Sequence, residues 1–112
     1  MKIDILSYSS HDLNNLKKEF KSNLINSLCG YKSTNLIGTI NSEQKTNLAI
    51  YNTVIHLGSK QPLMGLVVRN PVVPRHTLSN IREVKSFTIN HVTQKFYHKA
   101  HQTAARYTAK DK

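Results

Sequence analysis

The first quarter of the chain carries apolar residues at helical spacing. They recur every three or four positions, at Leu13, Leu16, Phe20, Leu24 and Leu28. This spacing predicts one amphipathic helix. Ser10 or Asp12 is expected to cap its start, and Gly30 to end it, because glycine readily adopts the left-handed conformation that follows a helix. Lys2–Leu6 alternates weakly before it and is expected to be a short strand.

The middle of the chain has the pattern of a β-hairpin followed by a buried strand. Asn35–Ile40 is expected to be a strand, Asn41–Lys45 a polar turn, and Asn47–Leu57 the returning strand. Leu63–Val68 is a continuous apolar run, which is typical of a strand buried on both faces. Gly65 within that run indicates a bulge or the close approach of another backbone.

The last third continues with alternating short elements. Thr77 is expected to cap a helix that runs to about Lys85. Ser86–Val92 is expected to be a strand, and Lys95–Tyr107 is compatible with a helix. Four strands with antiparallel signals and two or three helices predict a β-rich α+β domain, such as a partial barrel.

Composition and charge narrow the class of protein. A chain of 112 residues is about one domain. The net charge is +10, and residues 57–112 carry ten basic and two acidic side chains, so this half favours an anionic partner. The single cysteine, Cys29, excludes an internal disulfide and is expected to lie buried at a helix end. No signal pattern or membrane-spanning run appears, and we expect a cytoplasmic protein.

Two polar segments could bind a ligand. Arg75, His76 and Thr77 stand at an expected helix start, where unpaired N–H groups and the helix dipole attract phosphate. An ordinary capped helix with solvated cations is the alternative. Asn47, Asn52 and Thr53 place amide and hydroxyl groups in an apolar strand, where they would either hydrogen-bond a heteroaromatic ring or face solvent.

Other chemistry has less support in the sequence. His91, His98 and His101 would share a face of a continuous helix, but no carboxylate or cysteine lies near them, and Lys95 and Lys99 would repel a cation. We therefore expect no metal site. No pairing of a nucleophile with a base is apparent, so no catalytic residue is assigned.

An ordered set of short segments resembles the flavin reductase-like family, whose members have an FMN-binding split β-barrel. The resemblance extends over roughly residues 25–107. The segments are Asn35–Thr39, Thr46–Ala49, Gln61–Leu63, Arg69, Arg75–Thr77, Asn80–Ile81, Phe87–Asn90 and His101–Ala105.

The resemblance implies a set of flavin-binding residues. The strand from Asn47 to Val54 would run along the isoalloxazine ring. Arg75 and Thr77 would hold the FMN phosphate, with Asn52 and Arg69 near it. The expected cofactor-binding residues are Asn47, Ala49, Asn52, Thr53, Val54, Arg69, Arg75, His76, Thr77 and Thr103.

The resemblance also implies an activity and an assembly. The expected function is that of an NAD(P)H-linked flavin reductase or a flavoredoxin-like electron carrier, acting as a homodimer. Family members continue beyond the position of Lys112 through further strands, so the single domain formed by residues 1–112 is expected to be an incomplete barrel. Two alternatives stay open. One is a flavin-binding protein without turnover. The other is a small nucleic-acid-binding module that uses residues 57–112, where Phe96, Tyr97 and Tyr107 alternate with lysines.

Overall fold

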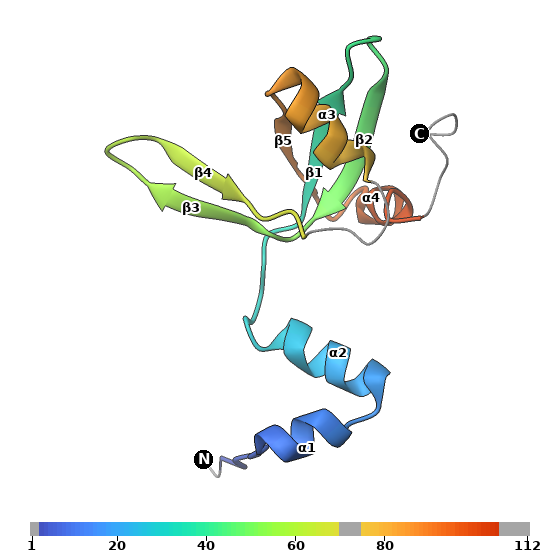
Figure 1. Ribbon diagram of the computed structural model, residues 1–112. Coiled ribbons are helices and arrows are strands. Elements are labelled where there is room, and N and C mark those ends of the chain that lie inside the picture. Colours follow the sequence, from blue (N-terminus) through green and yellow to red (C-terminus); the bar gives the residue numbers. More distant parts are fainter. Residues whose placement is uncertain (1–2, 70–74, 106–112) are drawn as a thin grey trace. The chain divides into compact units, whose positions relative to one another are not determined.

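The computed structural model describes residues 3–69 and 75–105 (Figure 1). The chain divides into two compact units, with the boundary after Tyr31. No helix in the described ranges is long and apolar enough to cross a membrane.

The first unit contains two short helices where the sequence predicts one. Helix α1 spans Ser10–Asn15 and helix α2 spans Lys18–Ser27. Leu16 and Lys17 between them have extended backbone, with ψ of 144° and 135°. The Asn15 side chain donates to the carbonyl oxygen of His11 at 3.0 Å. Such side-chain bonds to the backbone compete with continuation of a helix, and apolar spacing alone does not reveal them.

The start of α1 is capped one residue earlier than the sequence predicts. The backbone N–H of Asp12 donates to the Ser9 hydroxyl at 3.1 Å, and the Asp12 carboxylate accepts from the Ser9 backbone N–H at 2.8 Å. This is a reciprocal capping box. The Ser9 hydroxyl also donates to Asp12 Oδ2 at 2.7 Å. This bond, followed by the one from the Ser9 backbone N–H, lowers the pKa of Asp12.

The other expectations for this unit have mixed outcomes. Gly30 has a φ of 68°, so the predicted glycine stop is confirmed. The expected strand at Lys2–Leu6 is wrong for residues 3–6, which have no regular structure, because no second strand pairs with them. Cys29 is exposed, so its predicted burial is also wrong.

The second unit is built around a three-stranded antiparallel sheet. Its strands are β1 (Asn35–Ile40), β2 (Thr46–Tyr51) and β5 (Thr88–His91), in the order β2-β1-β5 (Figure 1). The central strand β1 has the predicted bounds. Ile37 pairs with Ala49 on one side and with Ile89 on the other, and it is fully buried.

The expected strand from Asn47 to Leu57 is broken, and its two parts belong to different sheets. The chain leaves the first sheet at Asn52 and Thr53, and β3 (Val54–Gly58) pairs with β4 (Leu63–Leu66) in a separate hairpin (Figure 1). No glycine or proline stands between Asn47 and Leu57, so the sequence has no strong turn signal at the break.

The hairpin also corrects the predicted burial of residues 63–68. Leu63, Met64 and Val67 are each more than half exposed, because the described residues provide no layer over the hairpin. The close approach of another backbone expected at Gly65 is wrong, and the register irregularity of the hairpin lies in the partner strand, between His56 and Gly58. A Cβ at Gly65 would lie 3.0 Å from the side chain of Ile55 and 3.1 Å from that of Leu57, so side chains rather than a backbone fill the space.

Two helices complete this unit. Helix α3 (His76–Val84) packs on β1 and β2, and helix α4 (Tyr97–Gln102) contacts β2. Arg75, not Thr77, occupies the N-cap position of α3, and Lys85 ends the helix with a φ of 60°. β5 and α4 are both shorter than predicted. Residues 70–74 and 106–107, which include the prolines before α3 and the end of the expected last helix, lie outside the described residues.

The interior of the second unit is small and rich in polar groups. Ile37 and Ala100 are the buried hydrophobic residues of the described ranges. Five polar residues are equally buried: Asn35, Thr39, Asn47, Thr77 and Asn80. The predicted α+β class is confirmed, and the sheet is open rather than closed into a barrel.

Gly38 in β1 provides a test of the sheet register. A Cβ at this position would lie 2.5 Å from the Thr88 hydroxyl oxygen and 3.6 Å from a methyl carbon of Leu48. We expect Gly38→Ala to lower the free energy of unfolding by about 1–3 kcal/mol through overpacking. Urea denaturation of the two proteins measures the difference. Adding Thr88→Ala should recover part of the loss, and an unchanged midpoint for Gly38→Ala would contradict the register.

Candidate functional site

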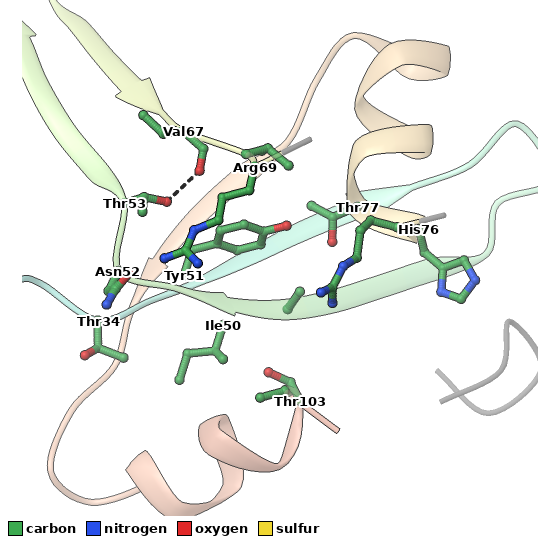
Figure 2. Close-up of a pocket in the computed structure, with 14 residues that line it drawn as sticks. Thr34, Ile50, Tyr51, Asn52, Thr53, Val67, Arg69, His76, Thr77 and Thr103 are labelled. Atoms are coloured by element: carbon green, nitrogen blue, oxygen red, sulfur yellow. Dashed lines mark hydrogen bonds between the residues drawn. The ribbon is translucent and has the colours of Figure 1, made fainter. Parts of the chain in front are cut away.

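A cavity of about 530 Å³ lies in the second unit, where the end of β2 meets the start of α3 and the end of α4 (Figure 2). This volume is within the range of small-molecule sites. Its described lining residues come from five separate segments. The lining residues are Thr34, Ala49, Ile50, Tyr51, Asn52, Thr53, Val67, Val68, Arg69, Arg75, His76, Thr77, Thr103 and Ala104.

Basic side chains gather in the cavity. Arg69 lies on the segment after β4, and Arg75 and His76 lie at the start of α3. No aspartate or glutamate is among the described residues that line it. The first N–H groups of α3 lie at the same end, and no side chain caps them. Arginine side chains and free helical N–H groups together favour a bound anion, phosphate above all.

Thr77 has a hydroxyl group that is ready to donate a hydrogen bond. Its side chain is only 3% exposed, and its oxygen accepts a hydrogen bond from Asn47 Nδ2 at 3.1 Å. The hydroxyl proton has no acceptor among the described residues. A hydroxyl that accepts one bond becomes a better donor for the next, so Thr77 is suited to bind an anionic oxygen in the cavity.

The other end of the cavity combines apolar side chains with polar groups from the end of β2. Ile50, Val67 and Val68 provide apolar surface, and Tyr51 provides an aromatic ring. In Figure 2 the guanidinium of Arg69 points toward Tyr51 and Asn52. A flat heteroaromatic ring needs this combination of apolar walls with a few polar groups at its edge.

Thr53 fixes the base of the β3–β4 hairpin beside the cavity. Its hydroxyl donates to the carbonyl oxygen of Val67 at 2.7 Å, and the Val67 N–H donates to the Thr53 carbonyl oxygen at 3.1 Å (Figure 2). The Thr53 hydroxyl proton is therefore already used within the protein. This pair of bonds holds the segment that carries Arg69 against the end of β2.

Most of the residues predicted from the sequence meet at this cavity, and two do not. Those that line it are Ala49, Asn52, Thr53, Arg69, Arg75, His76, Thr77 and Thr103. Asn47 lies buried under α3 instead, and Val54 belongs to the hairpin strand β3. Whether the lining residues bind a cofactor remains a prediction.

The sequence analysis missed several lining residues. Tyr51 is the most informative of them, because it pairs with Asn35 as Ala49 pairs with Ile37, which places both on the same face of β2. Because side chains two positions apart on a strand share a face, the assignment of Ala49 to the site could also have identified Tyr51. Thr34, Ile50, Val67, Val68 and Ala104 have no comparable signal in the sequence.

The histidines considered for a metal site are His91, His98 and His101. The ring of His98 lies 3.9 Å from that of Tyr97. No group of three metal-ligating side chains gathers within residues 3–69 and 75–105.

Comparison with known proteins gives one informative match. No protein-family model matches the sequence, and no curated protein does. Among solved structures the chain is similar to a candidate flavin reductase with a split barrel domain from Shewanella frigidimarina NCIMB 400. The two share 48% sequence identity and superpose with a TM-score of 0.86 over 92% of this chain. The predicted resemblance to the flavin reductase-like family is confirmed.

The match also explains the open sheet. The chain spans 50% of the length of that split-barrel protein. Its antiparallel strands therefore form an incomplete split barrel, as the resemblance implied. The cavity lies within this part of the flavin reductase-like fold.

The Thr53 hydroxyl allows a test of how the cavity wall is held. Thr53→Val keeps the shape of the side chain but removes the bond to Val67, which should cost about 0.5–1.5 kcal/mol of stability. We expect the Val67 amide to exchange its hydrogen faster in this variant, as measured by NMR. Thr53→Ser, which keeps the hydroxyl, is the control. Equal protection of Val67 in Thr53→Val and the unsubstituted protein would contradict this role.

Proposed function

We propose that the cavity binds FMN and that the protein takes part in flavin-linked electron transfer. The observation that carries this proposal is the position of the α3 start, where Arg75 and Thr77 line a cavity that Arg69 also lines, with no acidic side chain among the described lining residues. The similarity to a candidate flavin reductase supports a flavin as the ligand.

The phosphate of FMN fits the basic end of the cavity. Arg75 would bind it through its guanidinium, and Thr77 would donate its free hydroxyl proton. The uncapped N–H groups at the start of α3 add the positive end of the helix dipole. The monophosphate of FMN is the simplest flavin phosphate that this cluster could hold.

The isoalloxazine ring would lie against Tyr51, Val67 and Val68, with Ile50 on the other face of β2 near Thr103 (Figure 2). Backbone groups of β2 and the amide of Asn52 would hydrogen-bond the polar edge of the ring. Thr103, at the end of α4, would approach the ring from another side of the cavity (Figure 2). The chain thus offers both an anion-binding end and an apolar end in one cavity.

A bound flavin would supply the hydride chemistry, and the protein would bind and orient it. Such a protein needs no pair of acidic and basic groups for proton transfer, and the described lining residues include no acidic group. We propose NAD(P)H as the electron donor, because the excess of basic over acidic residues attracts phosphate-bearing nucleotides. Oxidation of NADH or NADPH in the presence of FMN distinguishes a reductase from a flavin-binding protein without turnover.

Flavin titrations with FMN and riboflavin test the phosphate end directly. We expect Arg75→Ala to weaken FMN binding by about 1.5–3 kcal/mol, the range for a hydrogen bond to a charged group. Riboflavin lacks the phosphate and should be affected far less. Quenching of flavin fluorescence gives both affinities.

Arg82→Ala is the matched control, because Arg82 is an exposed arginine in the last turn of the same helix. It should leave both affinities unchanged. Equal losses of FMN and riboflavin binding in Arg75→Ala would contradict a phosphate contact. Saturable binding of an oligonucleotide, with no binding of FMN, would favour the nucleic-acid alternative.

We further propose that the protein acts as a homodimer. The β3–β4 hairpin exposes Ile55, Leu57, Leu63, Met64 and Val67, which is more apolar surface than an isolated hairpin tolerates. Light scattering after size-exclusion chromatography should give twice the chain mass of 12.7 kDa or more. A cooperatively melting monomer of 12.7 kDa would contradict the proposal.

A further inference from the structure

Four buried polar side chains join the start of α3 to the sheet. Thr39 comes from β1, Asn47 from β2, and Thr77 and Asn80 from α3. They are 5%, 6%, 3% and 8% exposed. We call these four residues the amide–hydroxyl cluster. Of the four, only Thr77 lines the cavity.

Hydrogen bonds connect all four members. Asn80 Nδ2 donates to Thr39 Oγ1 at 3.1 Å, and Asn47 Nδ2 donates to the same oxygen at 3.4 Å. Asn47 Nδ2 also donates to Thr77 Oγ1 at 3.1 Å. The Thr39 hydroxyl is therefore the centre of the cluster on the sheet, and the Asn47 amide links it to Thr77.

We infer that Thr39, Asn47 and Asn80 are positioning residues for the phosphate end of the cavity. They act through Thr77 and the first turn of α3 and do not touch the ligand. The inference rests on the proposed binding of FMN. It assigns to Asn47 a role different from the contact with the flavin ring that the sequence predicts.

The first argument is that, among the described residues, no other side-chain hydrogen bond joins the first turn of α3 to the sheet. Arg75 at the N-cap makes no side-chain capping bond. The other tie between α3 and the sheet is at its far end, where the Ser42 N–H donates to Glu83 Oε1 at 3.2 Å. The amide–hydroxyl cluster is thus the hydrogen-bonded contact with the sheet that lies next to Arg75 and Thr77. Hydrogen bonds of this kind fix both the position and the orientation of the Thr77 hydroxyl group.

The second argument is that the cluster is poorly suited to stability alone. The Asn47 Oδ1 atom is buried without a hydrogen-bond partner among the described residues, and a buried acceptor left unpaired destabilises a folded protein. Apolar side chains of similar volume would pack at this interface without such a cost. A polar cluster that lowers stability in this way indicates that its function is to orient a group. The group it orients here is the O–H donor of Thr77.

Thr39→Val tests the inference at a residue that does not line the cavity. It removes the central hydroxyl and keeps the side-chain shape. We expect the FMN dissociation constant to rise roughly tenfold, because the phosphate loses well-placed donors, while that of riboflavin changes less than about twofold. Thr39→Ser should restore most of the FMN affinity. Glu83→Ala, which releases the other end of α3, should leave the ratio of the two affinities unchanged.

A double-mutant cycle separates positioning from general destabilisation. In the Arg75→Ala background the phosphate contact is already weakened, so Thr39→Val should then raise the FMN dissociation constant by less than about threefold. Thermal melting confirms that each variant is folded at the temperature of the titration.

The outcomes are distinguishable. Equal losses of FMN and riboflavin affinity in Thr39→Val, or the same factor in both backgrounds, would overturn the inference and leave the proposed function intact. If the unsubstituted protein does not bind FMN more tightly than riboflavin, the phosphate end of the proposed function fails and the inference fails with it.

Discussion

The hydrogen bonds between Thr39, Asn47, Thr77 and Asn80 hold α3 on the β1–β2 pair, and the cavity depends on this contact. Few apolar side chains share the task, since Ile37 and Ala100 are the buried hydrophobic residues of the described ranges. The hydrophobic effect has no direction, whereas hydrogen bonds fix both distance and angle. The start of α3 is therefore set by a polar interface, which places Arg75 and Thr77 at the mouth of the cavity.

The electrostatics of the site follow from which segments meet there. The Thr53–Val67 bonds hold the hairpin base beside the end of β2, so that Arg69 lines the same cavity as Arg75. Two arginines in one cavity, with no acidic side chain among its described lining residues, favour an anionic ligand. This is the physical reason to propose a phosphate-bearing flavin, in agreement with the similarity to a candidate flavin reductase.

Local signals in the sequence predicted the elements whose causes are local. The strand predicted at Asn35–Ile40, before the polar turn, has the bounds of β1, and the left-handed stop at Gly30 follows from glycine itself. The break at Asn52 and Thr53 could not be predicted, because it depends on β3 pairing with β4 rather than with β1. The exposure of Leu63 has the same origin, since a run of apolar residues shows that a strand can be buried but not that a covering layer is present.

In the candidate site, too, the sequence predicts what has a local cause and misses what depends on contacts between distant parts of the chain. The resemblance to a known family placed Arg75, Thr77 and Thr103 at one site, and the three do line one cavity. Asn47 was assigned to the ligand because an amide in an apolar strand is equally suited to a ring or to a buried partner. Its partners are Thr39, eight positions before it, and Thr77, thirty positions after it, and only the folded chain reveals the second.

The central claim is that one cavity at the start of α3 binds FMN. An NMR titration of the isotope-labelled protein with FMN tests it most directly, because it locates the ligand residue by residue. The account predicts saturable shifts of the amide signals of Ala49–Thr53, Arg69, Arg75–Thr77 and Thr103, with little change in α1 and α2. Saturable shifts centred on other residues, or no saturable shift in a folded sample, would contradict it.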